Sequence, residues 1–204
     1  MFRQGGDNVS HYYTDNADMS HDRRVISFRF LGVDYRFVSD KGVFSKDSVD
    51  LGTRLLLENI DHSSLKGDVV DVGCGYGVIA IIIAKISKAS LLAIDINSRA
   101  IELTKENAVL NNVSVKTCHH DGLSGIDQFF DTIITNPPIR IGKVKVYQLF
   151  AQAYEHLRVM GELWIVIRKQ QGASSAVEEL TRLFGNCAII TKKKGYWILK
   201  AVKA

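Results

Sequence analysis

The sequence predicts an α/β fold: a mostly parallel seven-stranded sheet with helices on both faces, a C-terminal antiparallel hairpin and an N-terminal β-hairpin before the sheet. Two observations predict this fold. Apolar β-branched runs alternate with amphipathic helical patterns from residue 69 onward, and a turn with three glycines joins the first run to a helix. A chain of 204 residues with 46% hydrophobic residues can build one sizeable core. We therefore expect a polar arm over residues 1–24 and a single domain over residues 25–204.

The segment before the glycine-rich turn predicts a hairpin and then a helix. Apolar and polar residues alternate between Val25 and Phe37, with a turn over residues 31–34, and this alternation is typical of two paired strands. The segment Gly-Val-Phe-Ser follows at residues 42–45. Its last residue, Ser45, is expected to cap a helix whose apolar stripe ends at Ile60.

After this helix, strand and helix patterns alternate regularly, which predicts parallel strands joined by crossover helices. Strands are expected over residues 69–72, 91–94, 113–118, 129–135 and 163–168. Helices are expected over residues 97–109, with Asn97 as the cap, and over residues 147–159 and 173–184. The terminal hairpin is expected over residues 187–190 and 196–201.

The three cysteines, Cys74, Cys118 and Cys187, are far apart and show no C-x-x-C spacing. A disulfide framework or a zinc site is therefore not expected, and a reducing cytosol suits such a chain. No apolar run approaches the roughly 18 residues that a membrane span needs, and the N-terminus has no apolar signal core. We expect a soluble cytoplasmic protein without a metal site or membrane contact.

The charges are unevenly distributed along the chain. Up to Asn136 there are 14 Lys and Arg residues against 18 Asp and Glu residues, and from Pro137 onward there are 12 against 4. This division suits a protein that holds a small cofactor in one half and a polyanion such as RNA near the other. Alternatively, the basic run at residues 192–194 and the scattered lysines are solvated surface.

The glycine-rich turn has the pattern Asp71-x-Gly73-Cys74-Gly75-x-Gly77 after a buried strand. Glycines allow a sharp bend and a close approach of backbone to ligand, so the turn predicts a nucleotide-type cofactor site. No Gly-Lys-Ser/Thr follows, which excludes a P-loop, and Val78 stands where a dinucleotide fingerprint has its third glycine. A nicotinamide site and a purely structural turn remain as alternatives.

Two further acids follow later strands. Asp95 lies at the end of the second strand of the sheet, where a carboxylate can accept both ribose hydroxyls, and this position would suit NAD equally well. Asp121 lies one strand further along, where its side-chain oxygen can accept from an adenine amino group. Aspartate is common in strand-end turns, but three such acids at neighbouring strand ends indicate one ligand site.

The segment Asn136-Pro137-Pro138-Ile139 carries the expected chemistry. The side-chain oxygen of Asn136 and the carbonyl of Pro137 can accept the two hydrogens of an exocyclic amine and hold its nitrogen in line with a methyl donor. The two prolines, which are the only ones in the chain, fix φ and keep the turn rigid. A strand-terminating Asn-Pro turn without chemistry is the alternative.

Together these motifs resemble the class I S-adenosylmethionine-dependent methyltransferases that act on amines. With residues 42–45 and Asp50-Leu51-Gly52, the chain resembles the catalytic domain of the small-subunit ribosomal RNA guanine-N2 methyltransferases. The resemblance implies a Rossmann-like fold, a cofactor-covering segment that ends at Ser45, catalysis by Asn136, Pro137 and Pro138, and substrate binding by Ile139, Arg140 and Lys143. It implies S-adenosylmethionine as cofactor, bound by Phe44, Asp71, Gly73, Cys74, Gly75, Gly77, Asp95, Ile96, Asp121, Gly122 and Asn136.

The chain departs from that family in two ways. The larger enzymes have two related domains, whereas this chain has length for the catalytic one, and Ile139 stands where many relatives carry an aromatic residue. We therefore expect a methyltransferase that acts on guanine N2 in small-subunit ribosomal RNA, either free or in a ribosomal particle. The alternatives are a protein glutamine or small-molecule amine methyltransferase, and a non-catalytic module that binds the cofactor or RNA.

Overall fold

The structure is a computed structural model that describes residues 20–138 and 142–204. Its strands are β1 (Arg24–Phe30), β2 (Val33–Ser39), β3 (Asp68–Val72), β4 (Ser90–Asp95), β5 (Lys116–His119), β6 (Phe130–Thr135), β7 (Leu157–Arg168), β8 (Ala188–Lys193) and β9 (Tyr196–Val202). Its helices are α1 (Leu51–Asn59), α2 (Val78–Ile86), α3 (Ser98–Leu110), α4 (Lys143–His156) and α5 (Ala173–Phe184), with a short 3₁₀ turn, η3 (Lys169–Gln171).

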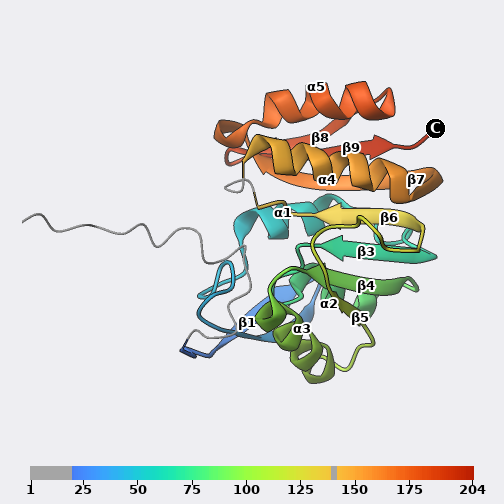
Figure 1. The fold of residues 1–204 in the computed structure, drawn as a ribbon. Coiled ribbons are helices and arrows are strands. Elements are labelled where there is room, and N and C mark those ends of the chain that lie inside the picture. The colour runs from blue at the N-terminus through green and yellow to red at the C-terminus, as the bar shows by residue number, and fades with distance from the viewer. Residues whose placement is uncertain (1–19, 139–141) are drawn as a thin grey trace, which may run out of the picture.

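The predicted fold class is confirmed. The main sheet has seven strands in the order β5-β4-β3-β6-β7-β9-β8, and β9 alone runs against the others. Figure 1 shows this order from β8 at the top of the view to β5 near the bottom. The chain runs outward from β3 to β5 and then returns to β6 on the other side of β3. This reversal makes the carboxyl ends of β3 and β6 the switch point, where α/β sheets bind their ligands.

Helices cover both faces of the sheet, and its strands are therefore apolar on both sides. Neighbouring residues of β3 show the alternation: Val69 packs in the core with α1, α2 and α3, whereas Val70 packs in the core with α4 and α5. Figure 1 shows α4 and α5 at one end of the molecule and the hairpin of β1 and β2 at the other. The strand-helix alternation in the sequence predicted this arrangement.

The N-terminal hairpin forms its own two-stranded sheet and docks on α3. Its turn consists of Leu31 and Gly32, both with positive φ, so it is two residues shorter than predicted. The side chain of Asn107 on α3 takes the place of a third strand: its Oδ1 accepts from the Val38 amide at 2.7 Å and its Nδ2 donates to the Val38 carbonyl at 2.8 Å. Asn111 bonds the amide and carbonyl of Arg36 in the same way. The side-chain amides of Asn107 and Asn111 thus form hydrogen bonds with backbone groups at the edge of β2, and these bonds fix the hairpin to the main body.

Several element boundaries differ from those predicted, among them the starts of α4, β5 and β7, and two of the differences have a clear physical cause. Ser45 does not cap α1; the cap is Asp50, whose carboxylate accepts from the Thr53 amide at 3.1 Å. Ser45 has a φ of 57° and lies in a series of turns that precedes the helix. At the other end of the fold, α4 ends at His156 and not at residue 159, because Leu157 already belongs to the buried strand β7.

Within the described residues, no helix has both the length and the apolar character needed to cross a membrane. The three cysteines are free thiols, and the described residues contain no cluster of acids, histidines and cysteines that could hold a metal ion.

Candidate active site

A cavity of about 590 Å³ opens at the carboxyl ends of β3, β4, β6 and β7. This volume is within the usual range for small-molecule sites. Most predicted site residues line it: Phe44, Gly73, Cys74, Gly75, Asp95, Ile96, Asp121, Gly122, Asn136, Pro137 and Pro138. Asp71, Gly77 and Lys143 are not part of the lining, and Ile139 and Arg140 lie outside the described residues.

The glycine-rich turn wraps the end of β4 and exposes backbone to the cavity. The amides of Gly73 and Cys74 both donate to the Ile94 carbonyl, at 2.8 and 3.0 Å. Gly73 and Gly75 have positive φ, and a Cβ at either position would point into open space. The left-handed conformation and the open space beside it therefore make this turn a surface on which a ligand can lie directly against the backbone.

Gly77 and Asp71 support the turn from beneath. A Cβ on Gly77 would come within 2.9 Å of the Thr104 side chain, so this glycine permits α2 to approach α3. Asp71 is buried, and its Oδ2 accepts from the Ala80 amide in the first turn of α2 at 3.2 Å. The buried carboxylate thus caps α2, whose own cap position, Gly77, has no side chain to do so.

Burial raises the pKa of Asp71 to about 7; the amide of Ala80 opposes this rise, and the nearby charge of Asp95 adds to it. Its second oxygen, Oδ1, is buried and has no hydrogen-bond partner among the described residues. A cationic ligand above the turn would stabilise the ionised form of this carboxyl.

Asp95 joins the turn to β4. Its Oδ2 accepts from the Gly75 amide at 2.8 Å, and its Oδ1 accepts from the Asn97 amide at 2.9 Å. Burial raises the pKa of Asp95, while these amides and the nearby His119 oppose the rise. Asp95 lines the cavity and each of its carboxylate oxygens can accept a second hydrogen bond, so Asp95 can also accept from two hydroxyls of a ligand.

The loop after β5 lines the cavity beyond Asp95. His120, Asp121 and Gly122 line it, and Gln152 of α4 faces them. The Gln152 Oε1 accepts from the Leu123 amide at 2.9 Å, and a Cβ on Gly122 would come within 2.4 Å of the same oxygen. Asp121 itself is exposed and makes no recorded hydrogen bond with the described residues, which leaves its carboxylate available for a ligand.

Residues 41–48, which we call the covering segment, form the wall of the cavity opposite the sheet. Val43 is buried, whereas Phe44 is 46% exposed and lies on the cavity. The segment is held from inside by Tyr76, whose hydroxyl is within 3.3 Å of the Ser45 carbonyl, and by Asn97, whose Nδ2 donates to the Gly42 carbonyl at 2.8 Å. The glycine-rich turn, which carries Tyr76, and the start of α3, which Asn97 caps, therefore both hold the covering segment in place.

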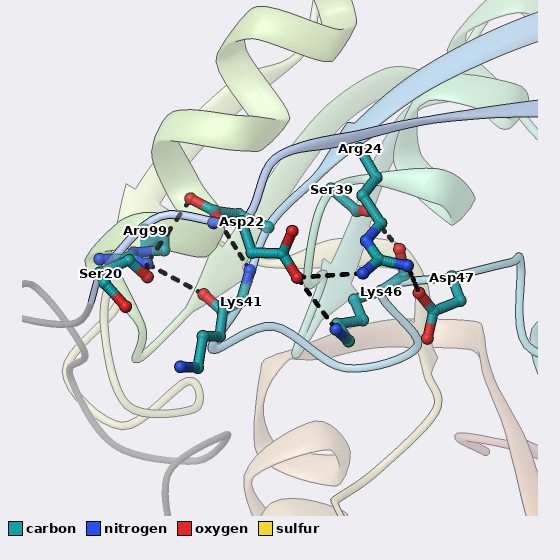
Figure 2. Close-up of polar contacts among 9 residues, drawn as sticks. Ser20, Asp22, Arg24, Ser39, Lys41, Lys46, Asp47 and Arg99 are labelled. Atoms are coloured by element: carbon teal, nitrogen blue, oxygen red, sulfur yellow. Dashed lines mark hydrogen bonds and ion pairs between the residues drawn. The ribbon is translucent and has the colours of Figure 1, made fainter.

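Charged residues hold the covering segment from outside (Figure 2). Asp22 lies between two cations, with its carboxylate 3.2 Å from both Lys46 Nζ and Arg24 Nη2, and Arg24 reaches on to Asp47 at 2.6 Å. Arg99, a buried residue of α3, donates to the Lys41 carbonyl at 3.0 Å. The first residues of the described chain thus tie the segment to the main body.

At the switch point, Asn136 is held by its amide nitrogen. Its Nδ2 donates to Thr53 Oγ1 at 3.0 Å and to Asp50 Oδ2 at 3.2 Å, both at the start of α1. Because Asp50 and Thr53 both accept from the nitrogen, they fix the orientation of the Asn136 amide. Its oxygen, Oδ1, is then the atom that can accept from a ligand. Below it, the Thr135 hydroxyl donates to the Val72 carbonyl at 2.7 Å and locks the ends of β6 and β3 together.

Asp50 continues this network to the end of the chain. Its Oδ1 accepts from the Tyr196 hydroxyl of β9 at 3.3 Å, and the Tyr196 oxygen accepts from Arg168 Nε of β7 at 2.8 Å. Gly52 is required by this contact, since a Cβ there would come within 2.7 Å of the Tyr196 ring. In the Asp50-Leu51-Gly52 motif, Asp50 therefore supplies a polar contact to Tyr196, and Gly52 leaves the space that the Tyr196 ring needs.

Sequence reasoning missed Thr53, Lys145, Arg168 and Tyr196 as site residues, and all four line the cavity. Thr53 directly follows the Asp50-Leu51-Gly52 motif, but no motif surrounds the other three, and the fold brings all four together. Lys143, which was predicted to bind substrate, instead lies with its ammonium 5.1 Å from the centre of the Tyr147 ring. Lys145, two residues further along α4, is the lysine that lines the cavity.

The two ends of the cavity suit two ligands. One end offers an open glycine backbone surface and aspartates to a nucleoside-like cofactor, and the other offers an oriented amide oxygen to a hydrogen-bond donor. Together with the sheet order, they define the class of the protein as a class I methyltransferase fold, as the sequence motifs suggested. The model of the methyltransferase small domain family matches residues 34–200, and the chain belongs to this family.

One relative matches nearly the whole chain in sequence, and solved structures match its fold. The uncharacterized protein YbxB of Bacillus subtilis (strain 168) is 46% identical over 197 residues, which are 95% of this chain and 98% of that protein. The structure of the T. thermophilus 16S rRNA N2 G1207 methyltransferase, in complex with AdoMet and guanosine, matches with a TM-score of 0.81 and 26% identity. The match covers 89% of this chain but 51% of that one, so this chain spans about half of its length.

A ribosomal protein L11 methylase from Lactobacillus delbrueckii matches with a TM-score of 0.65 and 24% identity over 75% of this chain and 79% of that one. This likeness concerns the fold. The predicted resemblance to the guanine-N2 methyltransferases is confirmed by the family and by the T. thermophilus structure.

Proposed function

We propose that this protein transfers a methyl group from S-adenosylmethionine to the exocyclic N2 amine of a guanine in small-subunit ribosomal RNA. The observation that carries the proposal is the orientation of Asn136: its Nδ2 is fixed by Thr53 and Asp50, and its Oδ1 is left as an acceptor beside the cofactor turn.

The residues at the cofactor end fit S-adenosylmethionine. Gly73 and Gly75 leave open space against the backbone, Asp95 can accept from ribose hydroxyls, and the loop at Asp121 and Gly122 can accept from an adenine amine. Asp71 acts indirectly, since it is buried beneath the turn and caps α2. When bound, the cofactor supplies an electrophilic methyl group on a sulfonium. The buried carboxylates of Asp71 and Asp95 favour that positive charge.

The Asn136 end supplies the means to use a poor nucleophile. The lone pair of an aromatic exocyclic amine is delocalised into the ring, so the nitrogen must be held and its hydrogens accepted as positive charge develops. Asn136 Oδ1 can accept one hydrogen, and the carbonyl of Pro137 can accept the other. Because the two prolines and the Thr135 contact keep the turn rigid, little reorganisation is needed during transfer.

Three observations favour RNA as the substrate. The C-terminal part of the chain is strongly basic, with 12 Lys and Arg residues against 4 acids from Pro137 onward. The T. thermophilus enzyme named for 16S rRNA has the most similar fold among the structures described above, and it was solved with guanosine bound. A cavity that places Asn136 below the protein surface suits a base that is unpaired or flipped out of its helix. Such a substrate implies a cytoplasmic enzyme.

Methylation of purified ribosomal RNA, free and in small subunits, with isotopically labelled S-adenosylmethionine tests the proposal. Nucleoside mass spectrometry of the product should show N2-methylguanosine, and ribosomal RNA from a deletion strain should lack that modification at one position. Label on a ribosomal protein instead of RNA would overturn the proposed substrate and favour a protein amine methyltransferase. Titration calorimetry that detected NADH binding but no S-adenosylmethionine binding would overturn the proposed cofactor.

A further inference from the structure

We propose that the sheet edge formed by the carboxyl ends of β7 and β8 and the amino end of β9 binds the sugar-phosphate backbone of the RNA strand whose target base enters the cavity. In this proposal Arg168 contacts a phosphate next to the target nucleotide, and Lys193 contacts the strand further along. The inference rests on the proposed function, because it assigns the route by which the RNA substrate reaches Asn136.

Arg168 is held in place although its side chain is exposed. Its Nε and Nη2 donate to the Tyr196 hydroxyl at 2.8 and 2.5 Å, and its guanidinium lies 4.8 Å from the centre of the Tyr196 ring. Tyr196 is buried and fixed in turn by Asp50. Arg168 Nη1 has no recorded partner among the described residues. One edge of the guanidinium is thus anchored and the other is free, at the mouth of the cavity.

The sheet register places a second cation in line with Arg168. Tyr196 pairs with Arg168 on one side and with Lys193 on the other. Residues directly opposite each other in an antiparallel pair project from the same face, so both cations project from the face that carries α1. The Lys169 amide donates to the Gly195 carbonyl at 2.8 Å, which brings the loop after β7 against the β8-β9 turn. Lys169 and Lys194 therefore lie next to the aligned residues Arg168, Tyr196 and Lys193.

β8, β9 and the turn between them contain no acid, since the sequence has no Asp or Glu after Glu179. Asp50, which contacts Tyr196, already accepts from Tyr196, Asn136 and the Thr53 amide. The cofactor end of the same cavity carries Asp95 and Asp121 instead. A phosphate group is therefore favoured at the Arg168 end over the cofactor end, and the guanidinium can bind it with two hydrogen bonds.

Lys192 provides a matched control. It is the neighbour of Lys193 in sequence and has the same charge, but it pairs with Trp197 and its ammonium lies 3.9 Å from the centre of that ring. Because side chains alternate along a strand, Lys192 projects from the opposite face, which carries α5. If RNA were attracted only by overall positive charge, Lys192 and Lys193 would contribute equally to RNA binding. In the proposed path, only Lys193 contributes.

The experiment measures the affinity of the full chain for a single-stranded RNA that contains the methylated site, between about 50 and about 200 mM salt. Each lost phosphate contact should flatten the plot of log affinity against log salt by about 0.7, the value expected for single strands. Arg168→Gln and Lys193→Gln should each show this change and raise the KM for RNA, with the S-adenosylmethionine affinity unchanged. Lys192→Gln should keep the wild-type slope.

Equal slopes for the Lys192→Gln and Lys193→Gln variants would overturn the assignment, as would a wild-type slope for both Lys193→Gln and Arg168→Gln. Lys193→Gln keeps the test valid if Arg168→Gln disturbs Tyr196, because Lys193 is exposed and outside the Asp50 network. If the wild-type protein methylates RNA while the variants keep its salt dependence, only this inference fails. If the wild-type protein neither binds nor methylates RNA, the proposed function fails as well.

Discussion

The two ends of the cavity are built in different ways. The cofactor end comes mainly from one continuous stretch, residues 71–80, supported by Asp95 from the next strand. The other end is assembled from four separate segments, which contribute Asp50 with Thr53, Asn136, Arg168 and Tyr196. The first end presents mostly backbone and carboxylates, and the second presents an oriented amide and a guanidinium.

This difference teaches how such a cavity can keep one cofactor while its second ligand varies. A local turn depends on glycine conformations that few substitutions leave intact. In contrast, each segment at the other end can change separately, provided the contacts with Asn136 are kept. We therefore expect substitutions at the first end to reduce cofactor binding, and substitutions at the second end to reduce turnover or RNA binding with the cofactor affinity unchanged.

The largest expected effect is at Asn136. Asn136→Ala should lower kcat by about 10²–10³, the usual loss for one well-placed transition-state partner, and leave S-adenosylmethionine affinity nearly unchanged. Asn136→Asp keeps an acceptor oxygen, but it places a second carboxylate beside Asp50, so its activity should also fall strongly. Single-turnover methyl transfer to the RNA substrate measures both, with circular dichroism as the control for folding. A fully active Asn136→Ala enzyme would place catalysis elsewhere.

A smaller effect is expected at Asp95, on the cofactor side. Asp95→Ala removes a charged acceptor for ribose and for the Gly75 amide, so S-adenosylmethionine binding should weaken by about 1.5–3 kcal/mol. Titration calorimetry measures this loss. With saturating cofactor, kcat should recover most of its wild-type value. A variant with normal cofactor affinity and low kcat would show that the division between the two ends is wrong.

Thr53 tests the orientation of Asn136 more gently. Thr53→Val is nearly isosteric and removes the hydroxyl that accepts from Asn136 Nδ2, while Asp50 keeps the second acceptor position. Loss of one neutral hydrogen bond, worth about 0.5–1.5 kcal/mol, should lower kcat by roughly two- to tenfold. Steady-state kinetics should find this change in kcat with unchanged S-adenosylmethionine affinity. An increased dissociation constant for the cofactor would instead assign Thr53 to the cofactor end.

The last expected effect concerns folding rather than ligand binding or turnover: the free energy of unfolding should depend on pH through Asp71. Burial, opposed by the Ala80 amide, raises its pKa to about 7 in the folded protein. Because the folded state holds this proton more tightly than the unfolded chain, this contribution to stability is full below about pH 4 and is lost as the pH rises to about 7. Asp71→Asn should remove this trend.

Chemical denaturation of the wild-type protein and the Asp71→Asn variant across that pH range makes the comparison. The stability of the wild-type protein relative to the variant should fall as the pH rises. Burial also raises the pKa of Asp95, and because Asp95 is buried in both proteins, that part of its contribution is common to both. A constant difference across the range would mean that folding does not raise the pKa of Asp71.

The sequence by itself determined the sheet, the order of its elements and the cofactor turn. These features depend on interactions close in the chain: the alternation of apolar residues, the φ angles that glycine permits at Gly73 and Gly75, and the rigid Asn136-Pro137 turn. Local patterns determine such features because neighbouring residues supply most of the energy that distinguishes one backbone conformation from another.

Only the tertiary structure decided which residues face the second ligand. Local preference suggested Ser45 as a helix cap, but the helix begins at Leu51 and its cap is Asp50, whose carboxylate is also fixed by Asn136 and Tyr196. Likewise, no sequence signal distinguishes Lys193 from Lys192, or Lys145 from Lys143. Contacts between segments up to 146 residues apart fix these positions. The positions of these side chains depend on how whole strands and helices pack against one another, and a short sequence pattern cannot predict that packing.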